Sequence, residues 1–222
     1  MKKMIAFFIA IMIPFIASAE TIDELMRQRE VLLIELSEVN EKIAQIKKAA
    51  IPFGSLGRIC DLFPDEVLAT IIRDNCAKFS IEQSITREEL EKISSINFSD
   101  VWKGYGEVCD LTGIGLLVNL KWVSGEYCGV HELPEEFRNC IHLQSLNMGY
   151  SDLEILPEWI GDFSELNSLN ITETNISKIP ETIGNLKNLK HLFIGGTKVT
   201  ELPNSIYNLQ LESLNMKGLP IK

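Results

Sequence analysis

The 222-residue sequence lacks the short motifs that mark several enzyme classes. It contains no nucleophile elbow, no glycine-rich phosphate-binding loop and no HExxH zinc motif. We therefore expect no catalytic activity, no cofactor and no metal site.

Positive charge is also scarce. The 21 lysines and arginines stand against 31 acidic residues, which gives a net charge of −10. Nucleic acids and anionic membranes both favour clustered lysine and arginine. The composition therefore argues against either of them as a partner.

Long apolar runs are missing except near the start, where Lys2 and Lys3 precede the apolar residues 4–16. This run is shorter than the roughly 20 residues needed to span a bilayer. Ala17-Ser18-Ala19 then has the small-residue spacing that signal peptidase recognises. We expect residues 1–19 to be a cleaved signal peptide and no membrane insertion afterwards. Removing two lysines leaves a mature net charge of −12, on an exported protein that is periplasmic or extracellular.

What the sequence has in abundance is a repeat. Pro134, Pro157, Pro180 and Pro203 are spaced by 23 residues each. Apolar residues keep the same spacing, and the unit reads LPxxIxxLxxLxxLxLxxxxIxx. The pairs Leu146/Met148, Leu169/Ile171 and Leu192/Ile194 alternate with polar residues, as in a short strand with one buried face.

This unit resembles the leucine-rich repeat, which implies an α/β solenoid with a parallel sheet on its concave face. Neighbouring units must stack, because one unit cannot cover its own apolar face. The column that usually holds asparagine has Cys128, Ser151, Thr174 and Thr197. These side chains still have groups that bond neighbouring backbone, so we expect the same fold with a looser ladder.

The region before the repeats predicts three further parts. Residues 20–50 have a helical pattern, with apolar heptad positions between 22 and 46. This predicts either a coiled coil that pairs copies of the protein or an amphipathic helix that folds back on the repeat domain or stands alone. Residues 51–60 contain proline and glycine and are interpreted as a linker. Residues 61–95 predict two helices, one beginning at Phe63-Pro64-Asp65-Glu66 and one at the capping box Thr86-Arg87-Glu88-Glu89, which continues through Ile93.

Residues 96–222 form the repeat domain. The order FPDEVLATII, ITREELEKISSINF and DLTG resembles the helical cap and opening repeat of bacterial internalin-like proteins. The resemblance implies that the helices cover the first strand, which is otherwise an open edge.

Cysteine and histidine do not make a convincing metal site. Cys128, His131, Cys140 and His142 have ligand-like spacing, but the repeat places them in columns that point in different directions. Burial explains Cys128 and Cys140. One disulfide among Cys60, Cys76 and Cys109 is plausible, and its pairing stays open.

The concave face is the candidate binding surface, because exposed aromatic side chains on rigid strands dominate interface energies. The expected contact residues are Trp122, Ser124, Glu126, Tyr127, Asn147, Tyr150, Asn170, Thr172, Glu173, His191 and Phe193. Some of them could instead pack against the N-terminal helix or the helical cap. The sequence thus favours an exported, non-enzymatic module that binds a protein partner. The alternative is a structural envelope protein whose residues 22–46 assemble copies.

Overall fold

The computed structural model describes residues 27–29, 54–99 and 107–220. Residues 27–29 are helical and fall within the predicted helix 20–50. The predicted signal peptide and the rest of that helix lie outside the described residues. The chain divides at residue 50, and the following concerns the second unit alone. Among the described residues, no helix has the length and apolar character to cross a membrane.

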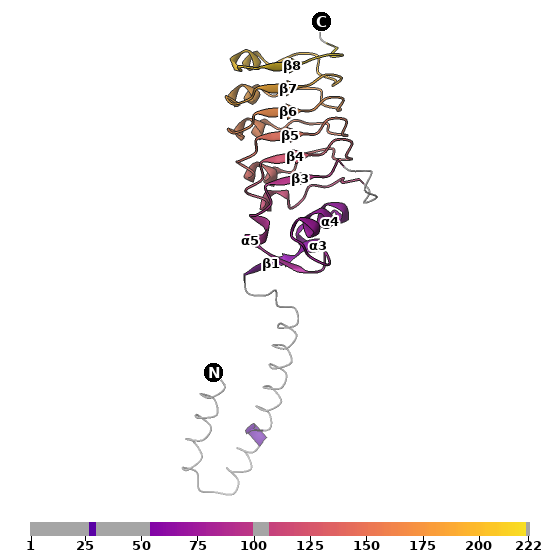
Figure 1. The fold of residues 1–222 in the computed structure, drawn as a ribbon, viewed down its shortest axis with the longest axis vertical. Helices are drawn as coiled ribbons and strands as arrows, with labels where there is room; N and C mark the ends of the chain where they lie inside the picture. The colour runs from indigo at the N-terminus through magenta and orange to yellow at the C-terminus, as the bar shows by residue number, and fades with distance from the viewer. Residues whose placement is uncertain (1–26, 30–53, 100–106, 221–222) are drawn as a thin grey trace. The chain divides into compact units, whose positions relative to one another are not determined.

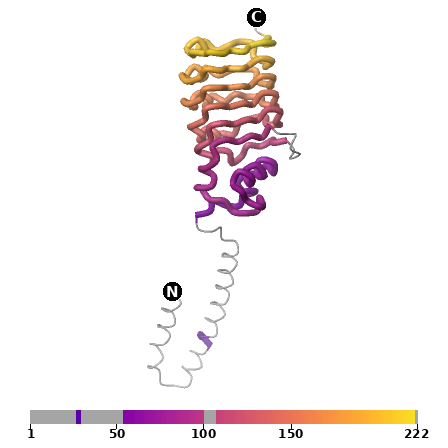
Figure 2. The backbone as a smooth tube through the Cα atoms, viewed as in Figure 1, coloured from indigo at the N-terminus to yellow at the C-terminus, as the bar shows by residue number. Residues whose placement is uncertain are grey.

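Six short strands form one parallel sheet in sequence order (Figure 1), and the turns of the chain that contain them are stacked one on the next (Figure 2). They are β3 (Ser95–Asn97), β4 (Trp122–Ser124), β5 (Ser145–Asn147), β6 (Ser168–Asn170), β7 (His191–Phe193) and β8 (Ser213–Asn215). The middle residue of each strand pairs with the middle residue of the next, as Leu146 does with Leu169. Both are buried, which confirms the predicted alternation and the stacked parallel sheet.

The spacing between paired residues departs from 23 at both ends of the sheet. Ile96 pairs with Val123, 27 residues later. Phe193 pairs with Asn215, 22 residues later. The extra residues at the first step follow β3, in the same connection as residues 100–106, which lie outside the described part of the chain. The sheet therefore accepts turns of different length without losing register.

The return segments are short 3-10 helices. The first follows Gly113, and the other four each follow one of the repeated prolines. They are η3 (Ile114–Leu116), η4 (Glu135–Asn139), η5 (Glu158–Asp162), η6 (Glu181–Asn185) and η7 (Asn204–Asn208). Pro157 precedes η5 with a φ of −71°, the value that its ring favours. Adjacent returns pack closely, because a Cβ built on Gly161 would lie 2.4 Å from the carbonyl oxygen of Thr182.

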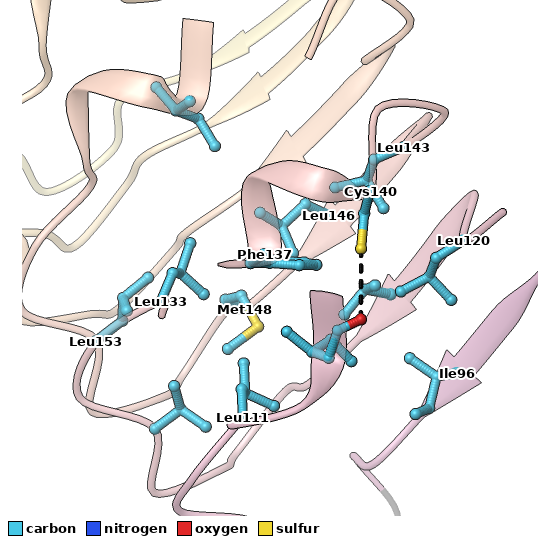
Figure 3. Close-up of a cluster of buried hydrophobic side chains, with 14 of the residues drawn as sticks. Ile96, Leu111, Leu120, Leu133, Phe137, Cys140, Leu143, Leu146, Met148 and Leu153 are labelled. Carbon is cyan, nitrogen blue, oxygen red and sulfur yellow. Dashed lines mark hydrogen bonds between the residues drawn. The ribbon is translucent and has the colours of Figure 1, made fainter. Parts of the chain in front are cut away.

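The core lies between the sheet and these returns (Figure 3). Cys140 fills a leucine position with no exposed surface, and its thiol donates to the carbonyl of Ile114 at 3.6 Å. Burial raises the pKa of this thiol to about 12. Burial therefore accounts for this cysteine, as the repeat column predicts.

The ladder column is held by hydroxyl groups. Ser151 Oγ, Thr174 Oγ1 and Thr197 Oγ1 are buried, and each donates to the backbone carbonyl three residues before it, at 2.6, 2.8 and 2.8 Å. The expectation that these side chains bond neighbouring backbone is confirmed.

Ahead of the repeats, β1 (Ser55–Arg58) and β2 (Ser84–Thr86) form an antiparallel pair, and α3 (Ile59–Leu62) follows β1. These elements occupy much of the segment 51–60 that the sequence predicts to be a linker. The linker interpretation is wrong for residues 55–60, because a strand distant in sequence supplies the hydrogen bonds that keep Ser55–Arg58 extended.

Two helices begin where the sequence predicts. In α4 (Glu66–Asn75), Asp65 Oδ1 accepts from the backbone N–H of Leu68 at 2.9 Å. In α5 (Arg87–Leu90), Thr86 and Glu89 form the complete capping box. This second helix is shorter than predicted, because the chain turns after Leu90 to enter β3.

Asp65 also connects this region to the repeats. Its Oδ2 accepts from the backbone N–H groups of Cys109 at 2.9 Å and Asp110 at 3.2 Å. Asn119 Nδ2 donates to the carbonyl of Glu91 at 2.9 Å. The helical segment and the first repeat are therefore joined by polar contacts as well as by the shared core.

Candidate functional site

The candidate site is the open face of the sheet, formed by the strand residues that alternate with the buried ones. Two rows cross the strands in register. The first row is Ser95, Trp122, Ser145, Ser168, His191 and Ser213. The second row is Asn97, Ser124, Asn147, Asn170, Phe193 and Asn215. All of the predicted contact residues reach solvent.

Aromatic side chains stand apart along this face. Trp122 is 47% exposed on β4, and His191 and Phe193 lie on β7 with stacked rings whose centroids are 6.5 Å apart. Three strand spacings separate Trp122 from His191, or about 14 Å at the usual 4.8 Å per strand. Ser145 and Ser168 occupy the positions between them. The sequence prediction did not include these two serines. The 23-residue spacing from Trp122 would have identified both of them.

The second row is dominated by asparagines that fix their own backbone. Asn147 Oδ1 accepts from the N–H of Gly149 at 3.2 Å and from Asn170 Nδ2 at 2.9 Å. Asn170 Oδ1 in turn accepts from the N–H of Thr172 at 3.0 Å. Asn97 and Asn215 make the same bond to the residue two positions on. These amides give the face a polar floor whose carbonyl oxygens are already engaged.

A third set of residues, the rim column, follows the strands. It consists of Tyr127, Tyr150, Glu173, Gly196 and Gly218, all with φ between 54° and 81°. Each of the first four donates its backbone N–H to a carbonyl in the following repeat, at 2.7–3.2 Å. These bonds hold the left-handed conformation even where the residue is not glycine, a conformation that L-residues normally avoid.

The rim column brings two predicted contact residues together. The rings of Tyr127 and Tyr150 are stacked, with centroids 4.8 Å apart and planes inclined by 13°. They remain 57% and 47% exposed. Glu173 follows in the column, and its carboxylate lies over Gly196, where a Cβ would be 2.3 Å from the Glu173 Cδ.

Charge is distributed unevenly along the face. Glu126, Asp152 and Glu173 lie in the repeats of β4 to β6, and within the described chain their carboxylates have neither a hydrogen bond nor an ion pair. Lys198 and Lys217 lie in the last two repeats. Lys190, which directly precedes β7, is bound to Glu212 at 2.8 Å, and this contact lowers the pKa of the Glu212 carboxyl.

The cysteine and histidine cluster is dispersed. His131 lies 3.5 Å from Glu154 and His142 lies 2.8 Å from Glu165, whereas Cys128 is buried. In the described ranges, no group of three or more His, Cys, Asp or Glu residues is placed to hold a metal ion. Cys60, Cys76 and Cys109 are free thiols, so the possible disulfide stays a prediction.

The parallel sheet, the proline-led returns and the repeat spacing together define a leucine-rich repeat solenoid. No protein-family model matches the sequence, and no curated protein matches it. The structure is similar to the functional domain of InlJ from Listeria monocytogenes, which includes a cysteine ladder. The TM-score is 0.59 at 21% identity, over 72% of this chain and 33% of that one.

A second similar structure is the ectodomain of the plant receptor kinase GASSHO1/SCHENGEN3 from Arabidopsis thaliana, solved with CASPARIAN STRIP INTEGRITY FACTOR 2. Its TM-score is 0.53 at 19% identity, over 61% of this chain and 17% of that one. The chain thus spans a third or less of either structure. At these identities the similarity concerns the fold alone. The present chain also differs from the InlJ domain in its ladder, which has one cysteine followed by hydroxyl residues.

Proposed function

We propose that this chain is an exported, non-enzymatic module that binds a protein partner through the open face of its sheet. The observation that supports this most directly is the combination of exposed Trp122, Tyr127 and Tyr150 with a rigid polar floor. Aromatic side chains on a fixed backbone lose little conformational freedom on binding and bury large area. Export rests on the sequence of residues 1–19, which lie outside the described structure.

The fold of the similar structures is consistent with this role, and one of them was solved with a ligand bound to its repeat ectodomain. An extended segment of the partner can cross the strands and contact Trp122 and the His191–Phe193 pair at the same time. The serines between them leave room for its backbone, because they carry the smallest side chains of the first row.

Substituting Trp122, Tyr150 and Phe193 together by alanine tests the proposal. The matched control replaces three exposed apolar residues outside the open face, Ile141, Ile155 and Tyr207. Both variants and the parent chain are used to capture proteins from the native envelope or from host extract. We expect the open-face variant to lose a partner that the control retains.

Equal capture by the two variants would refute binding through the open face. Light scattering on the same samples separates the alternative, an envelope protein assembled through residues 22–46. Loss of capture at unchanged oligomer size supports the binding module. Unchanged capture with a smaller oligomer on deleting residues 22–46 supports the structural role.

A further inference from the structure

The rim column accepts backbone strain at three positions where glycine would relieve it. The chain itself uses glycine at 196 and 218, with φ values of 68° and 81°. At the equivalent positions it has Tyr127, Tyr150 and Glu173, with φ values of 58°, 58° and 54°. Non-glycine residues persist in this region when the surrounding structure fixes them, and such strain gathers at ligand-contacting sites. The side chains of these three residues therefore point to a ligand.

The chemistry of the three side chains is complementary to a cation. The two stacked rings remain about half exposed, and the negative face of an aromatic ring attracts ammonium and guanidinium groups. Glu173 follows the pair in the column, and Glu126 immediately precedes Tyr127. Neither carboxylate is neutralised by another described residue. Lys198 and Lys217 form no ion pair with a described acidic residue, and they lie in the last two repeats, beyond Glu173.

We propose that the Tyr127–Tyr150 pair, with Glu126 and Glu173, binds the side chain of an arginine or lysine of the partner. This deepens the proposed function and rests on it. The partner is then an extended segment with a cationic residue placed at the carboxyl ends of β4 to β6. The net charge of −10 favours the same class of partner, because it attracts basic segments over a longer range.

The probe is Nα-acetyl-arginine amide. The control probe is Nα-acetyl-citrulline amide, which has nearly the same shape without the charge. Both are titrated into the full chain while the tyrosine ring resonances are followed by NMR. We expect saturable shifts at Tyr127 and Tyr150 with the arginine probe, weakened by salt. The citrulline probe should give markedly smaller shifts.

Two substitutions in the pair and one outside it complete the test. Tyr150→Leu and Tyr150→Gly should each weaken arginine binding about two- to fivefold, the range of an exposed cation–π contact. The glycine variant keeps the left-handed backbone that the chain uses at Gly196, so it guards against a folding defect. Tyr207→Leu, at a tyrosine that is 83% exposed on η7, should leave the affinity unchanged.

Equal binding of arginine and citrulline, or an equal loss in Tyr207→Leu, would overturn the cation site. A neutral oligosaccharide such as maltotriose that shifts the tyrosine rings more strongly than arginine would overturn it in favour of a carbohydrate ligand. If the arginine probe fails while the open-face variant still loses its partner, the cation site is refuted and the binding module stands. If both fail, the proposed function is refuted as well.

Discussion

Exchanging residues within the rim column tests whether its backbone is strained. Glu173→Gly places glycine where φ is 54°, and Gly196→Ala does the reverse where φ is 68°. The left-handed conformation costs an L-residue roughly 1–2 kcal/mol, whereas glycine loses about 0.4–1 kcal/mol more in ordering the unfolded chain. The difference predicts that Glu173→Gly raises the free energy of unfolding by about 0.5–1 kcal/mol. Gly196→Ala should lower it by at least as much.

The two positions are coupled through one contact. A Cβ on residue 196 would lie 2.3 Å from the Glu173 Cδ, so alanine there must displace that carboxylate. The side chain is flexible, and we expect a coupling energy of about 0.5 kcal/mol, near the lower end for contacting residues. In the double variant Glu173→Gly with Gly196→Ala this contact is absent. The free energy of unfolding of the double variant should therefore be about 0.5 kcal/mol higher than the two single changes predict when added.

Urea unfolding followed by far-UV circular dichroism gives the free energy of unfolding of all three variants. The slope of this free energy against urea concentration should be the same for each. Glu201→Gly is the matched control, because Glu201 is exposed and does not have a positive φ. There the same exchange should destabilise by about 0.5–1 kcal/mol. Destabilisation by Glu173→Gly equal to that of Glu201→Gly would refute the strain argument.

Three other predictions concern the core, the helical segment and the thiols. Leu169→Ala, at a fully buried site, should lower the free energy of unfolding by about 2–5 kcal/mol in urea. Asp65→Ala removes the acceptor of three backbone N–H groups and should cost about 2–3 kcal/mol in thermal unfolding. Burial raises the pKa of Cys128 to about 11 and of Cys140 to about 12, so mildly alkaline iodoacetamide should alkylate exposed Cys109 and spare both, by mass spectrometry.

The sheet is predictable from the sequence, because apolar residues recur at the same positions of each repeat and these are the positions that are buried. Leu146, Leu169 and Leu192 recur at one spacing and are all buried at the centres of paired strands. The repeated prolines then mark where the four returns η4 to η7 begin. Local start signals were equally informative, since the Asp65 cap and the Thr86 capping box depend only on residues three positions away.

Other features depend on contacts that the sequence does not contain locally. Ser55–Arg58 is extended because β2, near residue 85, pairs with it. The position of Trp122 was predictable from its column, but the engagement of Asn147 with both Gly149 and Asn170 was not. The stacking of Tyr127 on Tyr150 accompanies the left-handed backbone of the rim column. In the sequence, the glycines at positions 196 and 218 of that column were the only indication of this conformation.

The rim column and the open face differ in what holds them, and this determines their roles. Strand residues are fixed by buried neighbours on either side, so Trp122 and Phe193 can change without altering the backbone. Rim residues are fixed by hydrogen bonds from their own N–H groups to the next repeat, and side-chain identity there is independent of the core. A sequence that needed stability alone would have glycine at every rim position. Tyr127, Tyr150 and Glu173 oppose that preference. The proposed cation site accounts for all three, because each of these side chains belongs to it.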